Sequence, residues 1–415
     1  MKRKAHMLLC LILAGIMAFW GTSCGIPAQA EELSAGYERM TDETGEVTDE
    51  FRESMAEFSM TLFKGLVTKD DKNDLISPLS AVICLAMIAN GADGETKAQM
   101  EAAFGMDIET LNRSLYAYTS TLYRADDCKL NLADSIWFRN DRNELRVNEA
   151  FLQENADWYD AQIFAAPFDD STLKDINDWC KKYTDGMIKK MIDEIPADAL
   201  MYLVNALAFD AKWAQTYENK DITDGMFRNY DGSSKEVKML SSIENVYFCT
   251  DGVTGFAKNY AGDRYSIVGL LPNESVDLYD FIETLDGESW TALWDSRRSE
   301  SVAVQMPEFT YDASMKLNDT LMAMGMTDMF DGAKADFSKL GRSDGGNIFC
   351  AEVCQKTFIQ VDRNGTKAAA ITWGVMTKES APVALNSVIL DRPFVYAIVD
   401  NTVGLPIFIG AVTGL

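Results

Sequence analysis

The chain has 415 residues, of which 47% are hydrophobic and 25% charged, the composition of an ordinary globular protein. With 64 acidic and 38 basic residues its formal net charge is −26, which disfavours binding of nucleic acid or an anionic membrane through the general surface. The only histidine is His6. The rest of the chain therefore lacks any Ser-His-Asp, Cys-His or histidine-based metal site, and we expect neither a metal nor another cofactor.

Residues 1–30 have the three-part pattern of a secretory signal peptide. The basic run Lys2-Arg3-Lys4 precedes an apolar run from Met7 to Trp20, which is too short to span a bilayer. Cleavage after Ala28-Gln29-Ala30 would release a freely secreted protein. Gly21-Thr22-Ser23-Cys24 also resembles a bacterial lipobox, in which residues 1–23 are removed and Cys24 carries a lipid, the one expected contact with a membrane. Both alternatives predict an extracellular or cell-surface protein.

Residues 31–50 are acidic and rich in threonine, so we expect a flexible tether there. Residues 51–415 contain no internal repeat and no second linker, which predicts a single domain. Removing the leader leaves 35 basic and 64 acidic residues, a net charge of −29. The remaining cysteines lie mostly in apolar company without a CxxC pair, so we expect buried free thiols at Cys84, Cys128, Cys180, Cys249, Cys350 and Cys354.

The first half of the domain mixes helices with strands. Apolar residues recur at helical spacing from Phe51 to Thr68, which predicts an amphipathic helix. Ser77 is placed to cap, and Pro78 to begin, an almost wholly apolar helix ending at Gly91, which predicts burial. Further helices are predicted before Gly105 and at residues 108–124, 148–159 and 173–187, and strands at residues 129–138, 162–168 and 201–213.

Strands dominate the second half of the domain. They are predicted between residues 236 and 271, with a turn at residues 260–263, and again at residues 302–309 and 353–361. Short helices are predicted at residues 277–285, 290–296 and 317–324. Mixed helices and strands without regular alternation indicate an α+β fold with largely antiparallel sheets.

One long connection stands out at residues 361–380. It follows the strand at residues 353–361 and precedes an apolar hairpin, and long connections of this kind are usually functional or disordered. Thr366 followed by Ala368-Ala369-Ala370 fits the start of a helix equally well, because threonine caps helices and alanine favours them. The local pattern leaves both alternatives open.

The order of motifs from Phe51 to Leu415 resembles the serpin family. The motifs that carry the resemblance are residues 73–80, Asn90-Gly91-Ala92-Asp93-Gly94, Ile176-Asn177-Asp178-Trp179, Leu203-Val204-Asn205-Ala206-Leu207, Met306-Pro307-Glu308-Phe309, residues 324–330, Ala335-Asp336-Phe337-Ser338 and Asp391-Arg392-Pro393-Phe394. The resemblance implies about three mainly antiparallel sheets, eight or nine helices and an exposed reactive loop.

The resemblance also implies a function. The protein would be a monomer and no enzyme, and would inhibit serine proteases, with cysteine proteases as a second class, as a suicide substrate whose cleaved loop inserts into the main sheet. The alternative is a non-inhibitory serpin that acts as a binding or structural module. Residues Gly365, Thr366, Lys367, Ala368, Ala369 and Ala370 match the hinge of the loop. Alternate residues from Thr366 to Met376 are uncharged and mostly small, as the buried face of an inserted strand requires.

The family's motifs further imply a cluster beneath the point where the main sheet opens. Its members would be Ser77, Ser80, Asn205, Trp213 and Gln355. Gln355 stands where the family usually has histidine, and its amide can still donate and accept hydrogen bonds. Arg363 and Lys367 stand where acidic residues are common, which puts the rate of insertion in question.

The reactive bond follows from counting along the family's loop from Gly365. The count places it at Glu379-Ser380, which predicts an acid-preferring target protease. Cleavage after Lys378 would instead suit a trypsin-like enzyme. Cleavage at Met376 or Thr377 would suit an elastase-like one, and all three registers remain open.

Overall fold

The computed structural model describes residues 30–41, 45–69, 72–122, 128–140, 145–195, 199, 201–366 and 386–415. The described residues form nine α-helices: α1 Asp49–Leu66, α2 Pro78–Ala89, α3 Gly94–Phe104, α4 Ile108–Leu122, α5 Glu149–Tyr159, α6 Asp170–Tyr183, α7 Leu278–Glu283, α8 Gly287–Asp295 and α9 Asn318–Ala323. None of these helices combines the length and apolarity needed to cross a membrane.

The strands form three larger sheets and one two-stranded pair. The main sheet has the order β1-β5-β3-β6-β16-β15-β13, the second sheet β2-β19-β18-β11-β10-β9, and the end sheet β17-β12-β8-β7, while β14 pairs with β4. The strand bounds are β1 Glu31–Glu32, β2 Asp74–Ile76, β3 Cys128–Arg139, β4 Leu145–Val147, β5 Gln162–Ala166, β6 Met201–Lys212, β7 Ile222–Arg228, β8 Ser234–Glu244, β9 Val246–Cys249, β10 Val253–Asn259, β11 Tyr265–Pro272, β12 Val302–Pro307, β13 Phe309–Lys316, β14 Gly341–Ser343, β15 Cys354–Val361, β16 Gly365–Thr366, β17 Asn386–Ile389, β18 Phe394–Asp400 and β19 Leu405–Val412.

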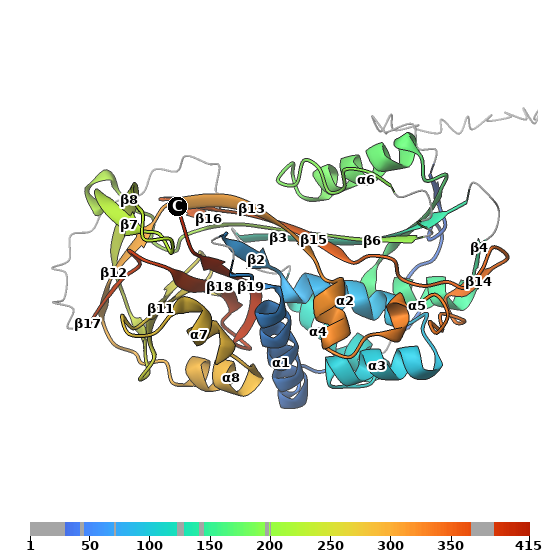
Figure 1. Ribbon diagram of the computed structural model, residues 1–415, viewed down its shortest axis with the longest axis horizontal. Coiled ribbons are helices and arrows are strands. Elements are labelled where there is room, and N and C mark those ends of the chain that lie inside the picture. The colour runs from blue at the N-terminus through green and yellow to red at the C-terminus, as the bar shows by residue number, and fades with distance from the viewer. Residues whose placement is uncertain are drawn as a thin grey trace, which may run out of the picture.

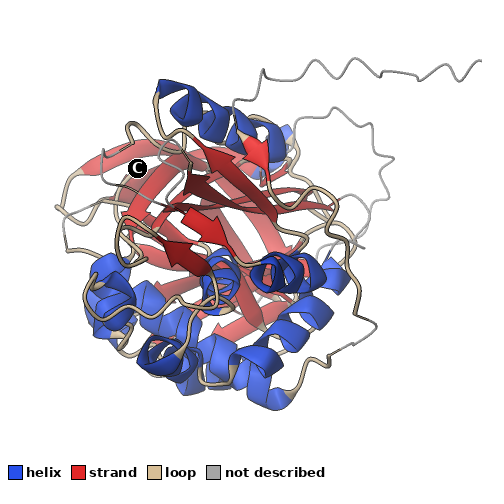
Figure 2. Ribbon diagram, turned by 90° about the vertical axis from the view of Figure 1, so that its right-hand side faces the viewer, coloured by secondary structure: helices blue, strands red, loops and turns tan. Residues whose placement is uncertain are grey.

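The main sheet lies between unequal layers of helices. Helix α6 covers its outer face, whereas α2, α4 and α5 lie on the opposite side (Figure 1). The end-on view shows the strands stacked in the centre with most helices gathered below them (Figure 2). Nearly all pairings are antiparallel; β3 with β5 and β12 with β17 are the parallel pairs. The predicted α+β fold with mainly antiparallel sheets is confirmed.

Helix α2 is the centre of the core, as its sequence predicts. All twelve of its residues are buried. The Ser77 side chain accepts a hydrogen bond from the backbone N–H of Ser80, and Pro78 occupies the first turn, where its missing N–H costs nothing. The Ser77 hydroxyl also donates to the Ile407 carbonyl at 2.8 Å, which fixes the start of α2 to β19.

Several elements depart from the sequence prediction, among them β13, which was not predicted beyond residue 309, and the short strands β2, β4 and β14. Helix α6 begins at Asp170 and not at residue 173, because the carboxylate of Asp169 accepts from the backbone N–H groups of Ser171 and Thr172 and caps the helix earlier. Strand β7 was not predicted, because only Phe227 among its seven residues is buried and the apolar alternation is correspondingly weak.

The described part of the expected tether is bound to the domain. Glu31 and Glu32 pair with Ala165 and Phe164 as strand β1 at the edge of the main sheet. The Ser34 hydroxyl accepts from the backbone N–H of Ile163 at 3.0 Å, and the guanidinium of Arg39 lies 3.6 Å from the centroid of the Tyr116 ring. The flexible tether predicted for residues 31–50 is therefore wrong for these positions, because backbone pairing and the guanidinium of Arg39 supply contacts that composition does not reveal.

The six cysteines of the described residues are free thiols, four of them buried. Burial raises the pKa to about 12 for Cys128, Cys180, Cys350 and Cys354. In the unfolded chain these thiols ionise near pH 8.5. Because the folded pKa is the higher one, the folded protein keeps protons that the unfolded chain loses, and stability falls as the pH rises above about 9.

We therefore expect the urea midpoint of unfolding to be flat from pH 7 to 8 and to drop progressively from pH 9 to 10.5, measured by tryptophan fluorescence with a reductant present. A midpoint that stays constant or rises over that alkaline range would contradict the assignment of these thiols as buried.

Candidate functional site

The first two residues of the predicted hinge already lie inside the main sheet. Strand β16 pairs antiparallel with β15 through Val361 and Thr366, and antiparallel with β6 through Gly365–Lys212 and Thr366–Ala211. Residues 367–385 lie outside the described residues, and with them the predictions for Lys367, Ala368, Ala369, Ala370, Lys378, Glu379 and Ser380. The described part of β16 ends at Thr366, and the chain is described again at Asn386, in the end sheet beside Val302 of β12.

Gly365 occupies a position that only glycine fits. A Cβ atom built on it would lie 2.0 Å from the Ala211 carbonyl oxygen and 2.8 Å from the Cα of Lys212. Both are backbone atoms of β6, so a side chain would force the two strands apart. The absence of a side chain lets β16 enter between its neighbours.

Thr366 is buried against an aromatic partner. Its exposed fraction is 2%, and its Oγ1 lies 2.5 Å from the hydroxyl oxygen of Tyr260. Tyr260 is fully buried, and this burial raises the pKa of its phenol well above the ordinary value. The phenol therefore keeps its proton and can hydrogen-bond Thr366 throughout the physiological range.

The turn between β15 and β16 is held by the end of β6. The carbonyl of Asp362 accepts from the Trp213 indole N–H at 2.8 Å, and the carbonyl of Asn364 accepts from the Trp213 backbone N–H at 2.9 Å. Between them, the carbonyl of Arg363 accepts from the backbone N–H of Tyr217 at 3.0 Å. The carbonyls of residues 362–364 are thus all bound by the segment Trp213 to Tyr217. These hydrogen bonds fix the position of the turn that leads into β16.

Arg363 has partners that its position in the sequence did not reveal. Its guanidinium donates to the Asn219 side chain at 2.8 Å and lies 3.8 Å from a carboxylate oxygen of Glu308. The basic residue at this position is therefore matched by an acidic one on the chain between β12 and β13. Since both side chains are partly exposed, the ion pair contributes little to stability.

Beyond Thr366, β6 and β15 lie next to each other without a strand between them in the described residues, and we call the line between them the seam. Because β16 is antiparallel to both β6 and β15, these two long strands are parallel to each other. Within the described residues no strand ladder joins β6 directly to β15. The facing edges of β6 and β15 therefore border the line along which β16 points.

The structure assembles part of the predicted cluster beneath this seam. The side-chain amide of Gln355 on β15 accepts from the backbone N–H of Ser77 and donates to the Ser77 carbonyl, both at 2.8 Å. Ser80 lies one turn further, its backbone N–H bonded to the Ser77 hydroxyl. Trp213 does not belong to this cluster and binds the turn before β16 instead. The side chain of Asn205 lies outside the described residues, although its backbone pairs with Asp134 of β3.

Replacing Gln355 with leucine should loosen the contact between β15 and α2. Gln355 is 6% exposed and Ser77 fully buried, so the substitution leaves the Ser77 N–H buried without a partner. We expect a loss of about 2–4 kcal/mol in the free energy of unfolding, measured by urea denaturation. A loss under about 0.5 kcal/mol would contradict the inferred importance of the two hydrogen bonds.

Gln355→His is the matched control. A neutral imidazole can replace one donor and one acceptor, whereas the protonated ring cannot accept from Ser77. Burial lowers the folded pKa of such a histidine, so stability should be close to wild type at pH 8 and fall as the pH drops below about 6.5. The wild-type protein, with its only histidine at position 6, should show no such dependence.

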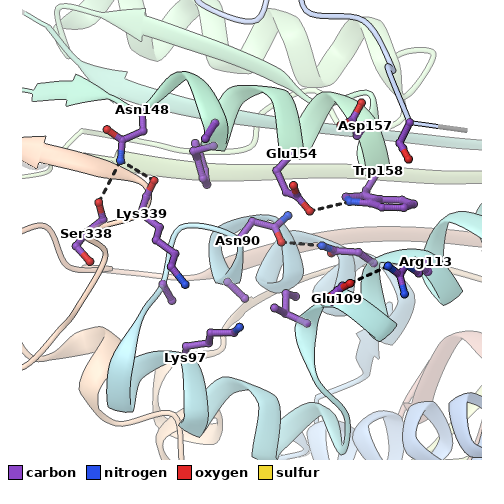
Figure 3. A pocket seen from close by; sticks show the side chains of 17 residues that line it. Asn90, Lys97, Glu109, Arg113, Asn148, Glu154, Asp157, Trp158, Ser338 and Lys339 are labelled. Atoms are coloured by element: carbon purple, nitrogen blue, oxygen red, sulfur yellow. Dashed lines mark hydrogen bonds and ion pairs between the residues drawn. The ribbon is translucent and has the colours of Figure 1, made fainter. Parts of the chain in front are cut away.

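A separate cavity of about 870 Å³ lies toward the opposite end of the molecule from β16, among α2, α3, α4 and α5 (Figure 3). Its polar walls are bonded to one another: Arg113 to Glu109 at 2.7 Å, and the Trp158 indole to Glu154 at 2.8 Å. Lys97 and Lys339 likewise pair with Glu101 and Asp93, and the cavity is not part of the hinge.

Sequence reasoning missed several residues of the site. Tyr217 and Tyr260, which bind the turn and Thr366, carried no motif beyond the turn signal at residues 260–263. Lys258 on β10 and Glu244 on β8, which lie beside them, were placed in strands without a role. The available signal was a lysine directly after Phe256 and Ala257 within a predicted strand, since lysine is seldom buried unless it is paired.

Comparisons with known proteins agree with this geometry. The family model described as "Serpin (serine protease inhibitor)" matches residues 53–414. Human glia-derived nexin is 29% identical over 357 residues, covering 82% of this chain and 87% of that one. The thermophilic serpin tengpin in its native state is 43% identical, with a TM-score of 0.90 over 94% of this chain and 100% of that one. In its latent state tengpin gives a TM-score of 0.81 over 90% of this chain and 100% of that one.

Proposed function

The chain belongs to the serpin family, and on that premise we propose that it inhibits serine proteases as a suicide substrate. The target's catalytic serine attacks the carbonyl carbon of the reactive bond, and the new amino terminus leaves as the amine. The protease then remains joined to the inhibitor as an acyl ester. The freed strand extends β16 along the seam between β6 and β15 before water can hydrolyse the ester.

The docked hinge is the observation that carries this proposal. Thr366 is paired with both β15 and β6, and Gly365 with β6, so insertion lengthens an existing strand as β6 and β15 move apart. Nucleating a strand is the costly step in such a process, and extending it adds hydrogen bonds to both neighbours. The uncharged alternate residues from Thr366 to Met376 meet the requirement for burying the inserted face.

We place the reactive bond at Glu379-Ser380, which favours an acid-preferring protease as the target. Specificity would be determined by the side chain that enters the primary pocket of the protease, so a shift of one residue to Lys378 would select a trypsin-like enzyme instead. Cysteine proteases form the same kind of acyl intermediate and are a second class of target.

A panel of proteases tests the proposal. The mature protein is incubated with a glutamyl-specific, a trypsin-like and an elastase-like serine protease, and the products are separated under denaturing conditions. We expect a covalent complex with the glutamyl-specific enzyme and a released fragment that begins at Ser380. A fragment beginning at Glu379 would assign the bond to Lys378. Clean loop cleavage by every enzyme without a complex would refute inhibition and support a non-inhibitory binding or structural module.

We also propose that the protein acts outside the cytoplasm, on the basis of its leader. If Cys24 carries a lipid, the pairing of Glu31 in β1 leaves only six residues, 25–30, between the lipid and the folded domain. Six residues reach about 20 Å at most. Labelling of the cells with a fatty-acid analogue should then mark the protein, and Cys24→Ala should abolish the label and release the protein into the medium.

A further inference from the structure

A buried ion pair lies beside the turn from which the reactive loop starts. The ammonium of Lys258 on β10 donates to a carboxylate oxygen of Glu244 on β8 at 2.9 Å. The side chain of Lys258 is 3% exposed and that of Glu244 is 14% exposed. Charged side chains are seldom buried to this degree in an otherwise apolar region.

The buried ammonium also faces two aromatic rings. It lies 4.6 Å from the ring centroid of Tyr217 and 5.6 Å from that of Trp213. Both distances are within the range in which a cation is attracted to an aromatic face, and the attraction is stronger where water is excluded. Lys258 thus contacts Glu244 through an ion pair and both aromatic rings through cation–π interactions.

Those two aromatic residues are the ones that bind the turn. Trp213 and Tyr217 donate the three hydrogen bonds to the carbonyls of residues 362–364. Trp213 also stacks on Tyr260 at 4.6 Å between ring centroids, and Tyr260 bonds the hydroxyl of Thr366. An unbroken series of contacts therefore runs from the ion pair to both ends of the segment that leads into β16.

Stability alone does not account for a charged pair in this place. Replacing a buried ion pair with apolar side chains of similar volume is often neutral or stabilising, because the cost of removing two charges from water offsets their attraction. A role in fixing a particular arrangement of neighbours is the better-supported use of such a pair. The neighbours that Lys258 contacts, and whose positions it can fix, are the rings of Trp213 and Tyr217.

We propose that Lys258 and Glu244 are positioning residues for loop insertion. By holding Trp213 and Tyr217 they keep the turn at residues 362–364 fixed, so that Gly365 and Thr366 stay docked while the rest of the strand enters the seam. The turn lies before the part of the loop that moves, so its contacts persist during insertion. The inference rests on the proposed inhibitory function. It states that these two residues make loop insertion, the final step of inhibition, more efficient.

The prediction concerns the partition ratio, which is the number of inhibitor molecules consumed for each protease molecule that is inhibited. Lys258→Met keeps the length and apolar stem of the side chain but removes the charge, and Glu244→Gln keeps the shape of its partner. With a protease that forms the complex, we expect either variant to raise the number of inhibitor molecules consumed per protease about three- to tenfold, while the association rate constant changes less than about twofold. Lys258→Arg, which keeps the cation, should stay within about twofold of wild type.

Asp400→Asn is the matched control for a general loss of stability. It neutralises another buried ion pair, in which a guanidinium nitrogen of Arg264 lies 2.7 Å from a carboxylate oxygen of Asp400. The further side-chain hydrogen bonds of this pair are with Thr121 of α4 and with Thr402, not with the turn at residues 362–364. We expect it to lower the unfolding midpoint without changing the partition. An equal rise in the partition of Asp400→Asn, or an unchanged partition in both Lys258→Met and Glu244→Gln, would overturn the proposal. If one variant does not fold, the other decides.

Hydrogen exchange separates failure of this inference from failure of the proposed function. In native wild-type protein the backbone N–H groups of Trp213 and Tyr217 are bonded to the turn, so they should exchange slowly. Lys258→Met should speed exchange there at least about fivefold, and Asp400→Asn should not. If wild type forms no complex with any protease, the inhibitory function fails and this measurement alone decides whether the ion pair holds the turn.

Discussion

Thr366→Arg is expected to convert the protein from an inhibitor into a substrate. Thr366 is 2% exposed and its hydroxyl is bonded to a fully buried tyrosine, so a guanidinium at this position has neither room nor an acidic partner in its present contacts. The arginine would therefore leave the main sheet in the native protein, and burying it again during insertion would cost about 3 kcal/mol or more, which slows insertion about a hundredfold or more. The protease would then hydrolyse the acyl ester and leave. Denaturing electrophoresis should show complete cleavage of the loop and less than a few per cent of covalent complex.

Two smaller substitutions at Thr366 show which property of the side chain inhibition depends on. Thr366→Ser keeps the hydroxyl that meets Tyr260 and should retain most of the complex. Thr366→Val keeps the volume but leaves the Tyr260 hydroxyl without this partner, so a partial loss is expected. Full-yield complex formation by Thr366→Arg would show that the hinge does not need to stay inside the main sheet, and the insertion mechanism would be wrong for this protein.

Glu379→Arg is expected to redirect the inhibitor from an acid-preferring protease to a trypsin-like one. The residue before the reactive bond enters the primary pocket of the protease, where a reversed charge is left unpaired. We expect the association rate constant to fall by about a hundredfold or more with a glutamyl-specific enzyme and to rise by a similar factor with a trypsin-like enzyme. The measurement is the loss of protease activity over time at several inhibitor concentrations.

Lys378→Ala is the control for the position of the reactive bond. If the bond follows Glu379, this change should affect the association rate constants by less than about fivefold, because the side chain lies outside the primary pocket. If wild type already inhibits a trypsin-like enzyme and Lys378→Ala abolishes that inhibition, the reactive bond follows Lys378. The proposed bond at Glu379-Ser380 would then be wrong.

The elements with a strong periodic pattern were predictable from sequence. Helix α2 could be identified as buried because every position is apolar and a serine and a proline mark its start. The family resemblance predicted Gln355 near Ser77, and in the structure its side-chain amide makes two hydrogen bonds to the backbone of Ser77. Local sequence and known motifs were sufficient in both cases.

Contacts between distant strands were not predictable in this way. Thr366 meets Tyr260 only because β6, β10 and β16 converge at one end of the main sheet, and the two residues are 106 positions apart. No local pattern indicates that register. The ion pair of Lys258 with Glu244 has the same origin, since its members come from two sheets and neither carries a motif.

The pairing of β1 has a consequence for how the protein behaves at high concentration. An open sheet ends in a row of unpaired N–H and C=O groups that can recruit a strand from another molecule. Here the border beyond β5 is formed by two residues only, and both are exposed glutamates. A second copy approaching this side would have to bring its own acidic surface against two like charges on a strand too short to template a ladder. This border of the main sheet is therefore protected against self-association.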